Sequence, residues 1–364
     1  MSAVLTDLGI AFGRVAFMML FVLNLGGLLT WVERKQSAIM QDRIGANRAS
    51  ILGLRLWGLF HPLADAIKML TKEDFLPARA DRLLFSLAPF VSVFFAIVAF
   101  ATIPFGDVLR LGGREFPLQA VPLNVGILYV FAMLSLGVYG VMMAGWASAN
   151  NYALLGGQRA AALMISAEVA IGASVMGVVI VYGSLDIMEI VRAQGRLLAG
   201  WIPAWGILTQ PLAFVLFLTA GIAVTRRIPF DFPEGESEII GYFVEYSGMK
   251  FGMFAMADFL ETVVIAGMAT SLFLGGWQVP YLGPAGFGFP WGATVPLPHP
   301  AVAGLQVAAF SLKVVLMLWF LMLVRWTLPR FRYDQAMRLG WLGLFPLSIL
   351  NLVVTGAIVL ALRS

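Results

Sequence analysis

Acidic side chains are concentrated in one short segment of the chain. Five of the twenty carboxylates fall within fifteen residues: Asp231, Glu234, Glu236, Glu238 and Glu245. A helix that starts near Pro233 would explain one or two of them, because carboxylates are favourable at the positive end of a helix. Five carboxylates this close together beside a membrane repel one another, and this raises the pKa of some of them. The segment is therefore a candidate for proton handling, and a solvated acidic loop is the alternative.

A second group of ionisable residues lies inside long apolar stretches, where a charge costs free energy and usually marks an ion or proton path. Glu168 is about two and a half helical turns from Arg159, too deep to reach water by snorkelling, so we expect it to carry protons. Asp258 and Lys313 are expected as further partners on this path. Arg14 is interpreted as an anchor at a span end, and Glu261 as a paired structural charge.

The composition excludes several other chemistries. The chain has no Cys, so thiolate catalysis, iron–sulfur ligation and disulfides are excluded, and its two histidines lie in different loops, which disfavours a haem or zinc site. We expect no metal on this chain. The net charge of +4 reflects where the loops lie, and we expect no nucleic-acid partner.

The elements that must position these residues are membrane helices. Hydrophobic residues make up 60% of the 364 residues and charged residues 12%, with a mean hydropathy of +0.88, so a soluble globule is excluded. The apolar stretches are long enough to cross a bilayer and lack the alternation of barrel strands. We predict an all-α polytopic bundle forming a single domain, 1–364, with about eight spans at 12–31, 83–104, 123–146, 159–182, 204–224, 251–274, 302–324 and 341–361.

The basic residues of the loops predict the orientation. Seventeen of them fall in one set of alternate loops and adjoining span ends, against five in the other. Because cytoplasmic loops carry an excess of Lys and Arg, we predict cytoplasmic loops at 33–81, 146–158, 225–250 and 325–340 and both termini in the periplasm. The lack of a transit peptide and the composition favour a multi-pass protein of a bacterial plasma membrane.

The first cytoplasmic segment contains an amphipathic pattern. Apolar residues alternate spacings of four and three and so share one helical face, whereas Asp65 and Lys68 fall on the opposite face; the apolar set is Leu56, Phe60, Leu63, Ile67 and Leu70. Pro62 is acceptable in the first turn of such a helix. We predict an interfacial helix, for which a simple membrane anchor is the alternative to a specific function.

Distinct motifs occur along nearly the whole chain. They are Trp31-Val32-Glu33-Arg34-Lys35, Gln41-Asp42-Arg43-Ile44-Gly45-Ala46-Asn47-Arg48, Pro62-Leu63-Ala64-Asp65-Ala66-Ile67-Lys68, Tyr152-Ala153-Leu154-Leu155-Gly156-Gly157, Ile165-Ser166 before Glu168, Pro229-Phe230-Asp231, Glu245-Tyr246-Ser247-Gly248-Met249 and Arg330-Phe331-Arg332-Tyr333-Asp334-Gln335. Together they resemble the membrane heel subunit of respiratory complex I, the family of the H subunit of bacterial NADH–quinone oxidoreductase and of subunit 1 of the mitochondrial enzyme.

The resemblance implies a subunit of an H⁺-translocating NADH:quinone oxidoreductase that holds no cofactor of its own and is not catalytic alone. Its substrate would be ubiquinone or menaquinone, and its partners would be the other membrane subunits, the lipid bilayer, and hydrophilic-arm subunits that carry FMN, the iron–sulfur clusters and the quinone head-group site. The first span, the amphipathic segment and the sixth span would flank the quinone tunnel. Residues expected at the tunnel or the docking surface are Glu33, Arg34, Arg43, Arg48, Asp65, Lys68, Arg226 and Arg332.

Three positions depart from the family pattern. Ala167 replaces the usual Tyr before Glu168, Ala46 replaces a Pro, and one residue fewer separates Glu238 from Glu245.

Two other functions are weighed against this one. A related membrane subunit of an energy-converting hydrogenase shares the spans but not the detailed loop motifs, and a stand-alone transporter would show internal repeats and broken midplane helices.

Overall fold

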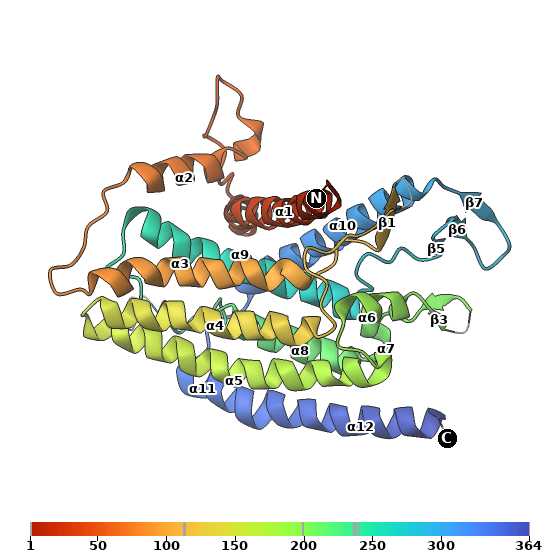
Figure 1. The fold of residues 1–364 in the computed structure, drawn as a ribbon. Helices are drawn as coiled ribbons and strands as arrows, with labels where there is room; N and C mark the ends of the chain where they lie inside the picture. The colour runs from red at the N-terminus through yellow and green to blue at the C-terminus, as the bar shows by residue number, and fades with distance from the viewer. Residues whose placement is uncertain (1, 112–113, 199, 236–238, 240, 364) are drawn as a thin grey trace.

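Long apolar helices form most of the structure (Figure 1). The computed structural model describes residues 2–111, 114–198, 200–235, 239 and 241–363. Within these residues, seven helical segments are long and apolar enough to cross a membrane: Leu8–Met40, Arg82–Thr102, Gly126–Ala147, Asn151–Tyr182, Gly248–Phe273, His299–Thr327 and Tyr333–Leu362. The expected polytopic helical fold is confirmed.

These segments belong to helices with slightly different bounds. They are α1 (Ser2–Met40), α3 (Arg82–Ala99) followed by the short η2 (Phe100–Thr102), α4 (Gly126–Ala147), α5 (Asn151–Tyr182), α9 (Gly248–Phe273), α10 (His299–Thr327), and the series α11 (Tyr333–Arg338), η3 (Leu339–Leu344) and α12 (Phe345–Arg363). Helix α1 continues through Glu33 and Arg34, which we had placed in a loop, and α5 begins before the predicted residue 159.

The predicted fifth span, 204–224, is a broken helix. It consists of α7 (Gly206–Thr209) and α8 (Pro211–Val224), and α8 is shorter than the ~20 residues that a crossing requires. The break lies at Gln210, whose backbone leaves the helical region, before Pro211, which has no N–H to donate. The Gln210 amide donates to Thr355 Oγ1 at 2.9 Å and accepts from Asn351 Nδ2 at 3.0 Å. Helix α12 therefore supplies polar partners to the broken region.

Helix α9 is the centre of the bundle. It packs against α1, α3, α8 and α10, and every residue from Leu260 to Phe273 is buried. A helix that is apolar on all sides is buried on all sides. Helices α3, α4, α5 and α12 form successive neighbours on one side of it (Figure 1).

The predicted amphipathic segment is a helix outside this bundle. It is α2 (His61–Thr71), preceded by the 3₁₀ turn η1 (Leu56–Gly58). Leu56 lies in that turn and Phe60 immediately before the helix, so Leu63, Ile67 and Leu70 are the predicted apolar residues that share it. Pro62 occupies the first turn, as expected. Leu63, Ile67 and Leu70 are each at least 50% exposed, which suits an apolar face turned to a membrane.

Short elements gather at the end of the bundle away from α2 (Figure 1). The hairpin β1 (Val108–Leu111) and β2 (Arg114–Pro117) pairs Leu109 with Phe116. Helix α6 (Ile187–Gln194) precedes the strands β3 (Leu197–Leu198) and β4 (Ile202–Pro203), and the predicted loop 275–300 contains β5 (Leu282–Gly283), β6 (Gly286–Gly288) and β7 (Thr294–Pro296). The first turns of α1 lie beside β1 and β2, and α12 ends at the same end of the bundle.

The close contact between α3 and α4 leads to a prediction. A Cβ atom on Gly140 of α4 would lie 2.8 Å from the Ser92 nitrogen and 2.9 Å from the Ala88 oxygen of α3. We expect Gly140→Ala to lower the stability of the solubilised protein by about 1–3 kcal/mol, as overpacking does. Gly172→Ala is the control, since a Cβ there meets nothing within 4 Å. Equal melting temperatures for the two variants would show that α3 and α4 do not approach this closely.

Candidate functional site

A polar cavity lies where α1, α9 and α10 meet the segment that follows α8. Its volume is about 190 Å³, and its lining is dominated by charged side chains: Glu33, Arg226, Arg227, Asp231, Glu234, Asp258 and Arg325, with Ala255 and Phe259. Glu33 comes from α1, Asp258 from α9 and Arg325 from α10, and the other charged residues come from the segment 225–247. Asp231 and Glu234 of the acidic segment therefore line a cavity of the bundle rather than extend into solvent.

The segment after α8 is attached to the chain that follows α10. The Phe331 nitrogen donates to the Pro229 oxygen at 3.0 Å, and the rings of Phe230 and Phe331 lie 5.4 Å apart. The Arg330 guanidinium donates to the carbonyl oxygen of Asp231. These contacts place Asp231 and Glu234 beside the cavity, and the described residues 233–235 and 239 are not helical, in contrast to the helix start considered near Pro233.

Arg226 is the most buried charge of the cavity. Its Nη2 lies 2.7 Å from Asp258 Oδ1 and 2.9 Å from Glu261 Oε1, and its side chain is 2% exposed. Burial opposes the charged guanidinium, but Glu261 and Asp258 outweigh it and raise the pKa of Arg226 above its ordinary value. Arg226 is therefore a permanent cation between two carboxylates of α9, and the expected pairing of Glu261 is present.

Glu33 joins two further guanidinium groups. Its carboxylate lies 2.8 Å from Arg325 Nη1 and 3.6 Å from Arg227 Nη1. Arg227 also stacks over the ring of Phe259, 4.1 Å from its centroid. Burial and the neighbouring Arg325 lower the pKa of Arg227, so the carboxylate of Glu33 relieves the repulsion between two cations.

Charged groups of both signs meet here, and we call them the charged cluster: Glu33, Arg226, Arg227, Asp231, Glu234, Asp258, Glu261, Arg325 and Arg330. Five are carboxylates and four are guanidinium groups, so full ionisation leaves one negative charge in excess (4 − 5 = −1). A buried net charge is costly, and protonation of a carboxylate removes it. The cluster can therefore hold a proton.

The pKa values of the two loop carboxylates show where this proton is held. Burial raises the pKa of Asp231 to about 6, although Arg330 and Arg325 act to lower it. Burial raises the pKa of Glu234 well above its ordinary value, and Asp258 and Asp231 raise it further. Neighbouring carboxylates share protons as a unit, so Asp231 and Glu234 together hold a proton more readily than free carboxyl groups do.

The other residues predicted for proton transfer lie apart from this cavity. Glu168 is on α5, where Ser135 of α4 forms a hydrogen bond with it, and its Oε1 is buried without a partner among the described atoms. Lys313 of α10 donates to the carbonyl oxygens of Leu274, Gly276 and Gln278 at 2.7, 3.0 and 2.7 Å. Lys313 thus caps the C-terminal end of α9, a favourable position for a cation.

The remaining acidic residues of the segment have different positions. Glu245 accepts a hydrogen bond from Asn150 Nδ2 at 2.8 Å, beside the start of α5, and it does not line the cavity. Glu236 and Glu238 fall outside the described residues. Of the three described carboxylates in the segment, Asp231 and Glu234 are thus the two that the structure brings together.

The residues expected at a tunnel or docking surface also separate into groups. Arg34 of α1 pairs with Asp65 of α2 at 2.6 Å, and Lys68 lies 3.8 Å from the same carboxylate. Arg226 is buried in the charged cluster. Arg43, Arg48 and Arg332 are exposed. Arg43 donates a hydrogen bond to Gln41 at 2.7 Å, and Arg332 pairs with Asp334 at 2.7 Å.

Four members of the charged cluster are not among the predicted site residues. Glu261 was interpreted as a paired structural charge, and Arg227, Arg325 and Arg330 were counted only among the basic residues that set the orientation. Arg227 and Arg325 stand directly at the ends of apolar stretches, where an arginine can turn inward to a carboxylate as well as outward to lipid headgroups. The neighbouring Glu33, itself at the end of an apolar stretch, was the signal for an inward pair.

The chain belongs to the NADH dehydrogenase family, whose model matches residues 13–356. It is 44% identical over 361 residues, 99% of each chain, to H subunit 1 of the NADH-quinone oxidoreductase of Geobacter metallireducens. It is also 44% identical over 349 residues, 94% of each chain, to the NADH-quinone oxidoreductase H subunit of Thermomicrobium roseum. A relative in Rhizobium meliloti, its NADH-quinone oxidoreductase H subunit 2, is 40% identical over 353 residues, 96% of this chain and 98% of the relative.

The burial of Arg226 predicts a large cost for its removal. Arg226→Gln leaves Asp258 and Glu261 without their cation, and loss of one partner from a buried ion pair costs about 3–5 kcal/mol. We expect low levels of the variant in membranes and a strongly reduced melting temperature after solubilisation. Arg192→Gln is the control, because its pair with Asp107 is exposed and should contribute at most about 1 kcal/mol. Similar losses in both variants would contradict the central position of Arg226.

The raised pKa of Asp231 predicts a pH dependence of stability. A carboxyl whose pKa is about 6 in the folded chain and about 3.9 in the unfolded chain binds more protons when folded. Stability from this group is therefore lost as the pH rises from about 4 to about 6. We expect the melting temperature of Asp231→Asn to fall less with rising pH across this window than that of the parent protein. Asp334→Asn, at an exposed site, should leave this pH dependence unchanged. Parallel curves for parent and Asp231→Asn would rule out a raised pKa.

Proposed function

We propose that this chain is the membrane H subunit of an NADH–quinone oxidoreductase, and that it forms the entrance for quinone and the start of the proton-coupling path. The charged cluster is the observation that carries the coupling role. It holds a proton beside the segment 225–247 and is built on helices that cross the membrane. The family membership and the names of the relatives supply the reaction.

The quinone entrance is proposed between α1, α2 and α9. Helix α2 contacts both of the others, and its apolar residues Leu63, Ile67 and Leu70 remain exposed. The pair between Arg34 and Asp65 holds α2 to α1. An apolar helix face beside two spans provides a surface along which a long isoprenoid tail passes from the bilayer.

The charged cluster lies between this entrance and the bundle interior. Glu33 directly follows the first apolar stretch on α1, and Asp258 is on α9, so both helices that border the entrance also contribute carboxylates to the cavity. Reduction of a quinone to a quinol consumes two protons. A negative charge that forms near the cavity raises the proton affinity of Asp231 and Glu234, and its removal lowers that affinity again. This change of affinity is the proposed coupling step.

Redox chemistry belongs to partner subunits in this proposal. FMN and iron–sulfur clusters in a hydrophilic arm supply the electrons, and the exposed Arg43, Arg48 and Arg332 offer multi-donor groups to the carboxylates of that arm. Protons pass by way of Glu168 to the other membrane subunits, and Lys313 holds the end of α9 in place. A bacterial plasma membrane with both termini in the periplasm remains our expectation. The hydrogenase alternative is disfavoured because the relatives carry the name of the quinone enzyme.

Neutral substitutions test the proposal. Glu234→Gln and Glu168→Gln keep the shape and hydrogen bonding of each side chain but cannot release a proton. We expect both variants to assemble, to retain NADH oxidation by artificial acceptors that bypass the quinone, and to lose most coupled quinone reduction, whereas Glu168→Asp retains part of it. The measurements are acceptor reduction and proton uptake in membrane vesicles.

A control and a contrary outcome sharpen the test. Glu189→Gln, at an exposed position on α6, should pump normally. If Glu234→Gln and Glu168→Gln both transfer protons at the parent ratio to electrons, the two residues are structural hydrogen-bonding groups and the coupling path lies elsewhere. If Glu234→Gln lowers the rate of quinone reduction but the activity that remains keeps the parent ratio of protons to electrons, the charged cluster serves the substrate alone.

A further inference from the structure

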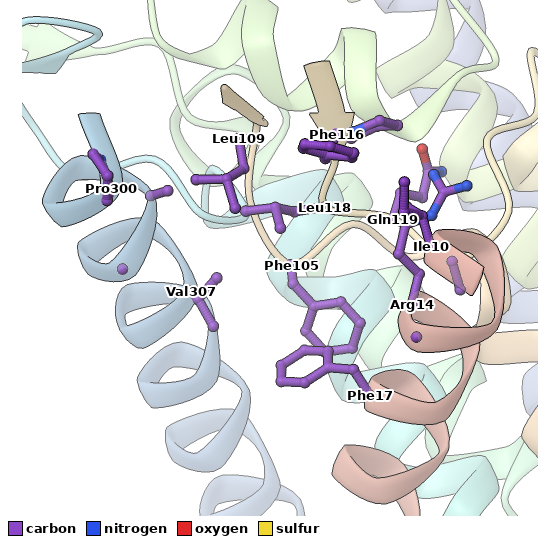
Figure 2. A pocket seen from close by; sticks show the side chains of 15 residues that line it. Ile10, Arg14, Phe17, Phe105, Leu109, Phe116, Leu118, Gln119, Pro300 and Val307 are labelled. Atoms are coloured by element: carbon purple, nitrogen blue, oxygen red, sulfur yellow. The ribbon is translucent and has the colours of Figure 1, made fainter. Parts of the chain in front are cut away.

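A second cavity lies at the end of the bundle away from α2, far from the charged cluster. It has a volume of about 580 Å³ and lies between the first turns of α1, the start of α10 and the β1–β2 hairpin with the residues that follow it (Figure 2). This volume falls within the ~300–1,000 Å³ of sites that bind small molecules. Apart from Arg14 and Gln119, the lining consists of apolar side chains, glycines and prolines.

The walls of this pocket are held in place by contacts outside it. Asp107, next to β1, pairs with Arg192 of α6 at 2.6 Å, and its backbone nitrogen donates to Gln306 Oε1 of α10 at 3.1 Å. His299 Nε2 lies 3.1 Å from the Val108 carbonyl oxygen. The hairpin is therefore fixed to two helices. The pocket does not depend on a ligand to hold its shape.

Aromatic rings close the pocket toward the bundle. Phe17 of α1 and Phe105 pack edge to face with centroids 5.1 Å apart, and Phe105 also packs against Phe310 of α10 at 5.5 Å. Figure 2 shows the rings of Phe17 and Phe105 together at one end of the pocket. Phe17 is 49% exposed, so the pocket opens on an exposed apolar face of α1.

Among the described side chains of the lining, Arg14 is the one that carries a charge. It has no ion pair or hydrogen bond with the rest of the described chain, and its Nε is buried. Gln119 lies next to it (Figure 2) but already donates its amide to the Thr102 oxygen at 2.6 Å. A cation within an apolar stretch is costly unless it meets water or an anion. The pocket thus combines an apolar volume with an unpaired guanidinium at its rim.

We propose that this pocket binds one phospholipid of the bilayer, with an acyl chain against Phe17 and Phe105 and the phosphate on Arg14. Guanidinium and phosphate form paired, charge-assisted hydrogen bonds, and an acyl chain fills an apolar volume that opens to lipid. A quinone would fill the same volume but would leave Arg14 unpaired, because it carries no anion. A fatty acid shares the anionic head and is separated from a phospholipid by the test.

The first experiment uses the parent chain in its assembled complex. Membranes are supplied with a phosphatidylglycerol that carries a photoactivatable group in one acyl chain, and the cross-linked residues are identified by mass spectrometry after digestion. We expect adducts concentrated on Phe17, Phe105 and Val307. An equally labelled fatty acid should give far fewer adducts at these positions. Adducts spread evenly over the exposed residues of α10, or equal labelling by the fatty acid, would overturn the proposal.

The second experiment measures retained lipid by native mass spectrometry of the complex in mild detergent. Ala303→Trp fills the pocket and should abolish the retained phospholipid, whereas Leu312→Trp, on the exposed face of the same helix, should keep it. Arg14→Gln should lower its occupancy by about tenfold, as expected for loss of a charge-assisted pair, and Arg110→Gln should not. The proposal is refuted if the parent retains no lipid, if it retains a quinone instead, or if a neighbouring polypeptide is cross-linked into the pocket.

Discussion

The buried guanidinium of Arg226 organises the functional end of the molecule. It sits between two carboxylates of α9, at 2.7 and 2.9 Å, and so ties the segment after α8 to the central helix. That segment then carries Asp231 and Glu234 to the same cavity that receives Glu33 from α1 and Arg325 from α10. Without the cation, Asp258 and Glu261 would face each other inside a membrane protein, and the acidic segment would lose its attachment.

The balance of charge around Arg226 also determines what the cavity can do. A cluster with equal numbers of buried cations and anions is a structural device that holds helices together. This cluster has one carboxylate more than it has guanidinium groups, so protonation of one carboxylate balances its charge. A proton that is held only because of an excess of negative charge responds to any further charge placed nearby, and this response is the property that coupling to a redox reaction requires.

Much of this arrangement could be predicted from sequence. Apolar stretch length and spacing predicted the long helices and the amphipathic α2, and the unusual density of carboxylates indicated the segment 225–247. Which of those carboxylates line the cavity could not be predicted from the sequence, because it depends on which residues the chain folds toward α9. Glu245 turns to Asn150, and Lys313 turns to the carbonyl ends of α9. The break at Gln210 was missed for a related reason: polar residues of α12, distant in sequence, satisfy it.

The cap that Lys313 forms has a mechanical consequence. Its three bonds to the carbonyls after α9 and the bonds of Arg226 to Asp258 and Glu261 fasten the central helix at two levels along its axis. A displacement of α9 along its axis would have to break both sets of bonds at once, so α9 is held in place within the bundle. By contrast, α2 has no buried residue and is joined to α1 by a partly exposed ion pair. Helix α2 also packs against α9, so its contacts with α1 and α9 are the ones that can rearrange while α9 stays fixed at both levels.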